Sequence, residues 1–259
     1  MFCNELTINY LKFYLFWFIL LRILNPTALR KFLLIIIGCF FAINSFAQYN
    51  YYRFSGGIGL GMNTAFTDLA KTRINQTIIG TIDYHLTPFV SAGLEIQSGT
   101  LSAGGKTVEE DAHLRFFKNG YTSFVAQGKV QIGQFVDFES SNFLYAIRGI
   151  YIGTGVGIIQ NNMKDIVRIK PTDGWHFPGE DKSTNIVIPL NTGVNINILD
   201  RWGYTRFIFT ANYQMNVTLG EGLDGYKDPK SKGFENNSPD MFGVLSAGIK
   251  ICFGPEGLY

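Results

Sequence analysis

The sequence predicts an all-β fold, an eight-stranded antiparallel up-and-down β-barrel that crosses a membrane and is preceded by a signal peptide. Three observations predict it. From about residue 50 onward the chain alternates apolar and polar residues, short and long connections follow one another, and aromatic residues gather near the short connections. A membrane barrel needs this arrangement, because one strand face meets lipid while the other lines the lumen, and its hairpins are short on one side only.

The predicted strands share a period of two, which is typical of strands with unlike faces. They are residues 52–62, 77–85, 89–98, 121–136, 143–160, 185–198, 205–218 and 241–253. The run 185–198 is the clearest, because its second half alternates isoleucine or valine with asparagine or glycine. A soluble β-sandwich or lipocalin-like barrel would also alternate, but its polar residues would face outward. Glycines, asparagines and isolated charges share one face here, which favours a crowded polar lumen.

The run 143–160 is the least regular of these. Tyr145, Ile147 and Tyr151 are predicted to face lipid and Arg148 the lumen. The apolar residues Ile150 and Ile152 then fall on the wrong face, so this strand could contain a β-bulge.

The lengths of the connections predict the orientation. The long ones are residues 63–76, 100–120, 163–184 and 219–240, and the short ones are 86–88, 137–142 and 199–204. An even number of strands puts both termini with the short turns, in the periplasm, and the long loops outside. Aromatic residues near the short turns fit a membrane-interface belt: Tyr84, Phe89, Phe135, Phe138, Phe143, Trp202, Tyr204 and Phe253.

Residues 1–47 are predicted to be an N-terminal extension and a secretory signal peptide, followed by the barrel at 48–259. Arg30 and Lys31 precede a short apolar run, and small residues at −3 and −1 indicate cleavage after Ala47. The stretch before about residue 29 is explained by a start site placed too far upstream, or alternatively by a membrane anchor. A lipobox ending at Cys39 is a further alternative.

Composition limits the function classes. From residue 49 onward there are 18 Lys and Arg against 19 Asp and Glu, a net charge of −1, so we expect no nucleic-acid partner. Of the three cysteines only Cys252 follows the signal peptide, which excludes a disulfide framework or a CxxC site. The 29 glycines and 15% aromatic residues suit tight lumen positions and interfacial belts.

A polar network is predicted inside the barrel. An eight-stranded barrel is just wide enough for side chains to fill it. Its lumen-facing charges are predicted to be Arg53, Asp83, Glu95, Lys129, Arg148, Arg206 and Lys250. Buried charges are costly unless they are paired, so we expect ion pairs across a plugged lumen rather than an open pore.

We expect no catalytic, cofactor or metal site. The glycine-rich stretches 56–61 and 153–157 lack the spacing of phosphate loops, and alternate glycines simply mark a lumen face. His113 and His176 lie in long loops near carboxylates, where an enzyme of the outer rim would need them, but solvated loop histidines are the simpler interpretation. The fourth loop, 220–229, has three carboxylates without calcium-loop spacing, and is interpreted as a polar turn.

The C-terminal segment resembles small outer-membrane β-barrel proteins of Bacteroidota. It carries LDGY at 223–226, an Asn/Ser-rich approach to Asp240, and the closing strand LSAGIKICFG at 245–254; the signal end SFAQ is similar too. The resemblance covers about residues 30–259 and its motifs are architectural. It implies a barrel similar to those of OmpA and OmpX, without an appended peptidoglycan-binding domain, and it carries over no catalytic residues.

These observations predict a non-enzymatic integral outer-membrane barrel whose long loops or wall contact external or complex-forming partners. Its expected partners are outer-membrane lipid and lipopolysaccharide, and proteins reached through the loops or the barrel wall. A narrow small-solute channel is the alternative. An enzyme of the barrel rim that modifies lipid or peptide is a third hypothesis.

Overall fold

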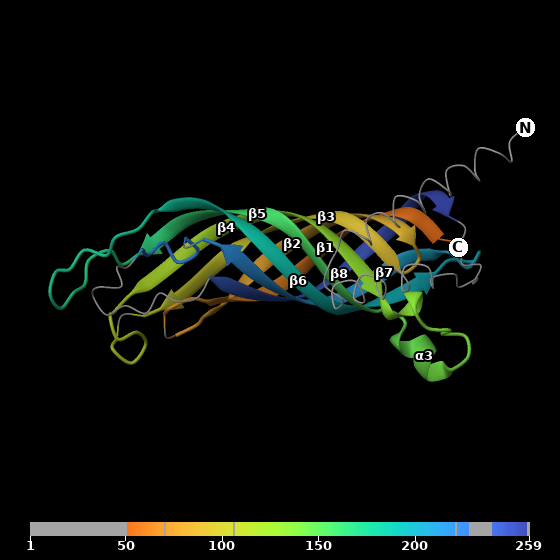
Figure 1. Ribbon diagram of the computed structural model, residues 1–259, viewed down its shortest axis with the longest axis horizontal. Coiled ribbons are helices and arrows are strands. Elements are labelled where there is room, and N and C mark those ends of the chain that lie inside the picture. Colours follow the sequence, from red (N-terminus) through yellow and green to blue (C-terminus); the bar gives the residue numbers. More distant parts are fainter. Residues whose placement is uncertain (1–50, 70, 106, 221, 228–239, 258–259) are drawn as a thin grey trace, which may run out of the picture. The chain divides into compact units, whose positions relative to one another are not determined.

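The computed structural model describes residues 51–69, 71–105, 107–220, 222–227 and 240–257. Its eight strands form one closed antiparallel barrel in sequence order, with β1 paired to β8 (Figure 1). The predicted eight-stranded up-and-down barrel is therefore confirmed. The predicted extension, the signal peptide and Cys39 lie outside the described residues, and so do Glu221 and residues 228–239 of the fourth loop.

Six of the eight strands are longer than the alternation predicted, mostly at their long-loop ends, whereas the fourth has the predicted length and the fifth is one residue shorter. The strands are β1 Tyr51–Phe66, β2 Ile74–Thr87, β3 Val90–Gly104, β4 Phe116–Gln131, β5 Ile150–Ile166, β6 Lys182–Leu199, β7 Thr205–Leu219 and β8 Met241–Gly257. A 3-10 turn, η1 Ile132–Gln134, and a short helix, α3 Asn142–Ile147, separate β4 from β5. The short connection predicted at 137–142 is therefore wrong: β4 ends at Gln131, and the connection covers residues 132–149. No helix in the described part of the chain is long and apolar enough to cross a membrane.

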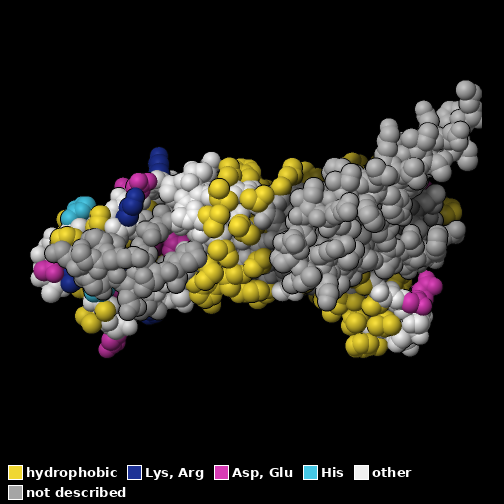
Figure 2. All heavy atoms as spheres, in the orientation of Figure 1, with side chains coloured by type: hydrophobic (Ala, Val, Ile, Leu, Met, Phe, Trp, Pro, Cys, Tyr) yellow, Lys and Arg dark blue, Asp and Glu magenta, His cyan; other side chains and the backbone are white. Residues whose placement is uncertain are grey.

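The outer face of the barrel carries an apolar belt. Ile58, Ile78 and Leu94 are 72%, 64% and 64% exposed, although they are large hydrophobic residues. Figure 2 shows this belt as hydrophobic side chains across the middle of the barrel, with polar and charged residues toward the long loops. The alternative of a soluble barrel or sandwich is wrong, because such a fold would bury these side chains and expose the polar ones.

The start of the predicted fifth strand is wrong. Residues 142–147 form α3, whose N-cap Ser141 accepts a hydrogen bond from the Phe143 amide through its side chain. Strand β5 begins only at Ile150 and pairs with β4 from Tyr151 onward. This shifts the phase, so that Ile150 and Ile152 face outward and Tyr151 is 1% exposed inside the barrel. Tyr145 and Ile147 belong to the helix (Figure 1).

The barrel interior has two zones. Apolar side chains gather in the long-loop half, where Leu101, Phe117, Ile159 and Phe242 are buried in one cluster. Paired charges and amides occupy the middle and the short-turn half. The lumen is therefore more apolar toward the long loops than its predicted face of glycine, asparagine and charge.

Candidate functional site

The barrel interior contains four of the charged residues that the alternation assigned to it: Asp83, Glu95, Lys129 and Lys250. All are less than 10% exposed. The Lys250 ammonium lies 2.5 Å from Asp83 Oδ2, and the Lys129 ammonium lies 3.9 Å from Glu95 Oε2. Each buried ammonium thus has a carboxylate partner, which offsets the cost of removing both charges from water.

A chain of hydrogen bonds continues from Glu95 across the interior. Gln127 donates to Glu95 at 2.7 Å, and Asn191 donates to Gln127 at 2.9 Å. Asn212 donates to Asn191 at 3.2 Å and accepts from the Tyr151 hydroxyl at 2.9 Å. These residues come from β3, β4, β6, β7 and β5, so the chain ties most of the barrel wall together. Sequence reasoning missed Tyr151, because it assigned the wrong phase to β5.

The three arginines predicted in the lumen lie toward its short-turn end, and two of them are exposed. Arg53 is exposed beside a bulge in the pairing of β1 with β8, and it donates to the Tyr84 hydroxyl at 3.2 Å. Arg206 is also exposed, because it is the second residue of β7 and reaches only the rim of the barrel. Arg148 is buried, at 8% exposed, but it follows α3 instead of lying in a strand, and its guanidinium is 3.5 Å from the centroid of the Tyr145 ring.

Aromatic side chains close the short-turn end of the interior. Phe89 and Phe138 are 2% and 4% exposed, and their rings meet edge-to-face with centroids 5.2 Å apart. Gly133 in η1 makes room for the Phe89 ring, since a Cβ at that position would collide with it. These two residues do not belong to the predicted interface belt, whereas Phe135, Phe143 and Trp202 are 69%, 68% and 82% exposed.

Residues 222–227 of the fourth loop pack against the other end of the interior. Leu223 and Tyr226 are 0% and 4% exposed, and both belong to the apolar cluster. The Tyr226 hydroxyl lies 2.9 Å from the carbonyl oxygens of Phe116 and Val167 and accepts a hydrogen bond from the Phe116 amide at 3.2 Å. Gly225 adopts φ 74°, a left-handed conformation that favours glycine. Residues 222–227 are thus largely buried, which differs from the predicted polar turn.

The fourth loop also buries a carboxyl group. Asp224 is 5% exposed and accepts a hydrogen bond from the Tyr226 amide at 3.0 Å. Burial and then the nearby Asp240 carboxylate raise the pKa of Asp224 well above its usual value of 3.8. Asp240 itself accepts hydrogen bonds from the amides of Gly222 and Leu223 at 3.3 and 3.1 Å.

Little space remains between these groups. The cavity beside Glu95, Lys129, Tyr151 and Lys250 has a volume of about 30 Å³. This is room for about two water molecules. The interior is therefore filled by side chains in its middle and covered at both ends.

One histidine has a partner of catalytic type. His85 Nε2 lies 2.9 Å from Ser55 Oγ, a separation typical of a nucleophile and its base. The pair is buried at the short-turn end, however, and the adjoining cavity has a volume of only about 20 Å³. Asp83, which could orient the histidine, lies against Lys250 instead. An enzyme of the outer rim would need this chemistry at the opposite end.

The loop histidines are placed differently from each other. His113 is partly buried in the second long loop, where its amide donates to Asp111 at 3.0 Å, and His176 is exposed in the third. Within the described ranges, no group of three or more His, Cys, Asp or Glu side chains is placed to hold a metal ion.

The chain matches no protein-family model and no curated protein. Among solved structures it is similar to Neisserial surface protein A, with 12% identity, a TM-score of 0.46, and coverage of 77% of this chain and 97% of that one. It is also similar to Ail of Yersinia pestis, solved in complex with the heparin analogue sucrose octasulfate, with 11% identity, a TM-score of 0.39 and coverage of 79% and 100%. For OprG of Pseudomonas aeruginosa the values are 10%, 0.36, 79% and 98%.

Proposed function

We propose that this protein is a non-enzymatic integral outer-membrane β-barrel, whose long loops and outer wall contact external or complex-forming partners. The apolar belt on the outer face carries the proposal, together with the paired charges buried in the middle of the barrel. A closed barrel satisfies all of its backbone groups within the bilayer, and only a lipid environment makes such a belt favourable. In this orientation both termini and the β4–β5 connection are periplasmic, and the connections after β1, β3, β5 and β7 face outward.

Membrane insertion is tested by extracting the expressed protein from outer membranes and comparing its gel migration with and without heating. We expect the protein to resist carbonate extraction and to migrate faster when unheated, because the closed barrel stays folded in detergent. Epitope tags placed in the third loop should be accessible on intact cells. A monomer that stays soluble in buffer without detergent would contradict the proposal.

The structure favours an occluded barrel over the alternative of a narrow channel. Ion pairs fill the middle of the interior, while Phe89 and Phe138 cover one end and Leu223 and Tyr226 the other. Planar bilayers containing the purified protein should therefore show no unitary conductance steps above those of protein-free bilayers. Reproducible steps that are abolished by denaturation would favour the channel.

The absence of enzymatic activity is part of the same proposal. Support comes from the position of the Ser55–His85 pair, which is buried beside a cavity too small for an acyl or peptidyl substrate. Mass spectrometry of lipid A from a deletion strain should show no change. A lost modification that returns on complementation with the wild type, but not with Ser55→Ala, would show that the pair is catalytic.

A further inference from the structure

The outer wall of β3 to β6 changes from apolar to polar between two adjacent rows of residues. The last apolar row consists of cross-strand neighbours on these strands: Ile96, Phe124, Ile158 and Ile186. The next two rows toward the long loops are polar or small: Ser98, Thr122, Gln160 and Thr184, and then Thr100, Gly120, Asn162 and Lys182. Under the proposed function, this step marks the boundary between acyl chains and headgroups in the outer leaflet.

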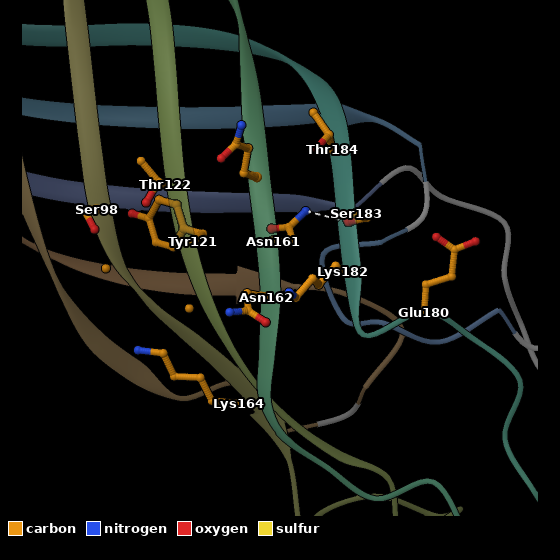
Figure 3. Close-up of a pocket in the computed structure, with 13 residues that line it drawn as sticks. Ser98, Tyr121, Thr122, Asn161, Asn162, Lys164, Glu180, Lys182, Ser183 and Thr184 are labelled. Atoms are coloured by element: carbon orange, nitrogen blue, oxygen red, sulfur yellow. Dashed lines mark hydrogen bonds between the residues drawn. The ribbon is translucent and has the colours of Figure 1, made fainter.

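A groove of about 640 Å³ lies on the polar rows (Figure 3). Gly120 forms part of its floor and leaves room for the Lys164 side chain, since a Cβ at Gly120 would collide with Lys164 Cε. The aliphatic part of Lys164 thus lies across β4, with its ammonium at the wall. Lys182 and Asn162 line the groove from β6 and β5.

The groove offers cations together with hydroxyl and amide groups. Neither Lys164 nor Lys182 forms an ion pair with a described residue, in contrast to the lysines of the interior. Glu180 also lines the groove but lies apart from Lys164 in Figure 3. Ammonium groups bind phosphate as point charges, and side chains such as Gln160, Asn162 and Thr122 supply donors and acceptors that suit sugar hydroxyls.

An apolar groove of about 400 Å³ adjoins this site on the belt side. Gly80 lines it, and so do the side chains of Ile82, Leu94, Ile96 and Phe124. Ile96 and Phe124 are two positions along their strands from Ser98 and Thr122 of the polar groove. A single molecule with an apolar tail and a polar, anionic head could occupy both grooves at once.

We propose that these adjoining grooves bind one outer-leaflet glycolipid, with its phosphorylated saccharide head against Lys164 and Lys182 and an acyl chain in the groove at Gly80. The inference depends on the proposed outer-membrane location. The long-loop side is where such a headgroup would lie, and the two cations complement its phosphates.

The test is lipid binding to the purified full chain in dodecyl maltoside, measured by native mass spectrometry. The probes are bis-phosphorylated lipid A, its dephosphorylated form, and phosphatidylglycerol. We expect one lipid A to bind in preference to the other two. The double variant K164Q/K182Q should bind lipid A with an affinity that is reduced about tenfold or more, because it loses charge-assisted bonds to phosphate.

The matched control is K170Q/K227Q, which removes the same charge from the long-loop end outside the groove, and it should bind as the wild type does. Gly80→Leu should also weaken binding, since the new side chain would enter the apolar groove, where a Cβ at Gly80 meets only Ile96 within 4 Å. Heat-modifiable migration shows that each variant is folded.

Equal affinity for phosphorylated and dephosphorylated lipid A would overturn the inference, and so would an equal loss in the control variant. Displacement of lipid A by an equal concentration of inorganic phosphate would overturn the assignment to a lipid and leave only an anion site. Folded protein that inserts into membranes but binds no lipid A would refute this inference and leave the proposed function standing. Protein that does not insert would refute the proposed function as well.

Discussion

The buried pair of Asp83 and Lys250 provides the sharpest test of the interior. Lys250→Met removes the ammonium that lies 2.5 Å from the carboxylate and leaves Asp83, 2% exposed, without this partner. Removing one member of a buried pair typically costs about 3–5 kcal/mol. We expect this loss of unfolding free energy from either Lys250→Met or Asp83→Leu alone.

The double variant D83L/K250M removes both charges together and should lose less stability than either single variant, because an apolar pair of similar volume needs no compensation. Lys71→Met is the control, since it breaks a half-exposed pair with Glu110 and should cost less than about 1 kcal/mol. Urea unfolding in lipid vesicles, followed by tryptophan fluorescence, measures all four proteins. A double variant that loses the sum of the single costs would refute the reasoning.

Three further predictions concern the belt, the fourth loop and the glycines. Leu190→Arg, on the lipid-facing side of β6, should lower the free energy of unfolding by about 2–4 kcal/mol in urea unfolding. Thr184→Arg lies on the same face but on the long-loop side of the belt, and should cost at most about 1 kcal/mol. Equal costs would contradict the belt. Because the pKa of Asp224 is raised, its contribution to docking of residues 222–227 should be complete below pH 3.8 and should be lost as pH rises through the raised pKa. Asp224→Asn should remove that dependence and slow amide exchange in the loop at pH 7, and unchanged exchange would contradict it. Gly155→Ala should destabilise the barrel by about 1–3 kcal/mol in the same unfolding assay, because the new Cβ would collide with the carbonyl oxygen of Ala126 in β4. An unchanged urea midpoint would show that β5 can move away from β4.

The alternation predicted the eight strands and most of their faces, because the period of two reports directly which side chains share a side. It failed where that period does not apply. Ser141 is a helix N-cap residue and is the signal that could have placed α3 before β5. The burial of Leu223 and Tyr226 could not be predicted, because it depends on contacts with strands more than a hundred residues earlier in the chain.

Charged residues were the hardest to place. The alternation of side chains along a strand placed Arg53 and Arg206 on the inner face. It does not indicate how far along the barrel a residue lies. At the rim an inward-directed arginine can reach water, so it needs no buried partner. Asp83 and Lys250 lie farther in, where solvent is excluded and an ion pair compensates for lost hydration.

The pairing of charges also indicates where recognition takes place. Inside the barrel, Lys129 and Lys250 are already matched by Glu95 and Asp83, so binding an anion there would require breaking an existing pair. On the wall, Lys164 has no carboxylate partner among the described residues and lies beside a groove open to the outside. An anionic ligand there would add a partner without removing one. The same residue type therefore stabilises the fold in the interior and remains available for binding on the outer wall.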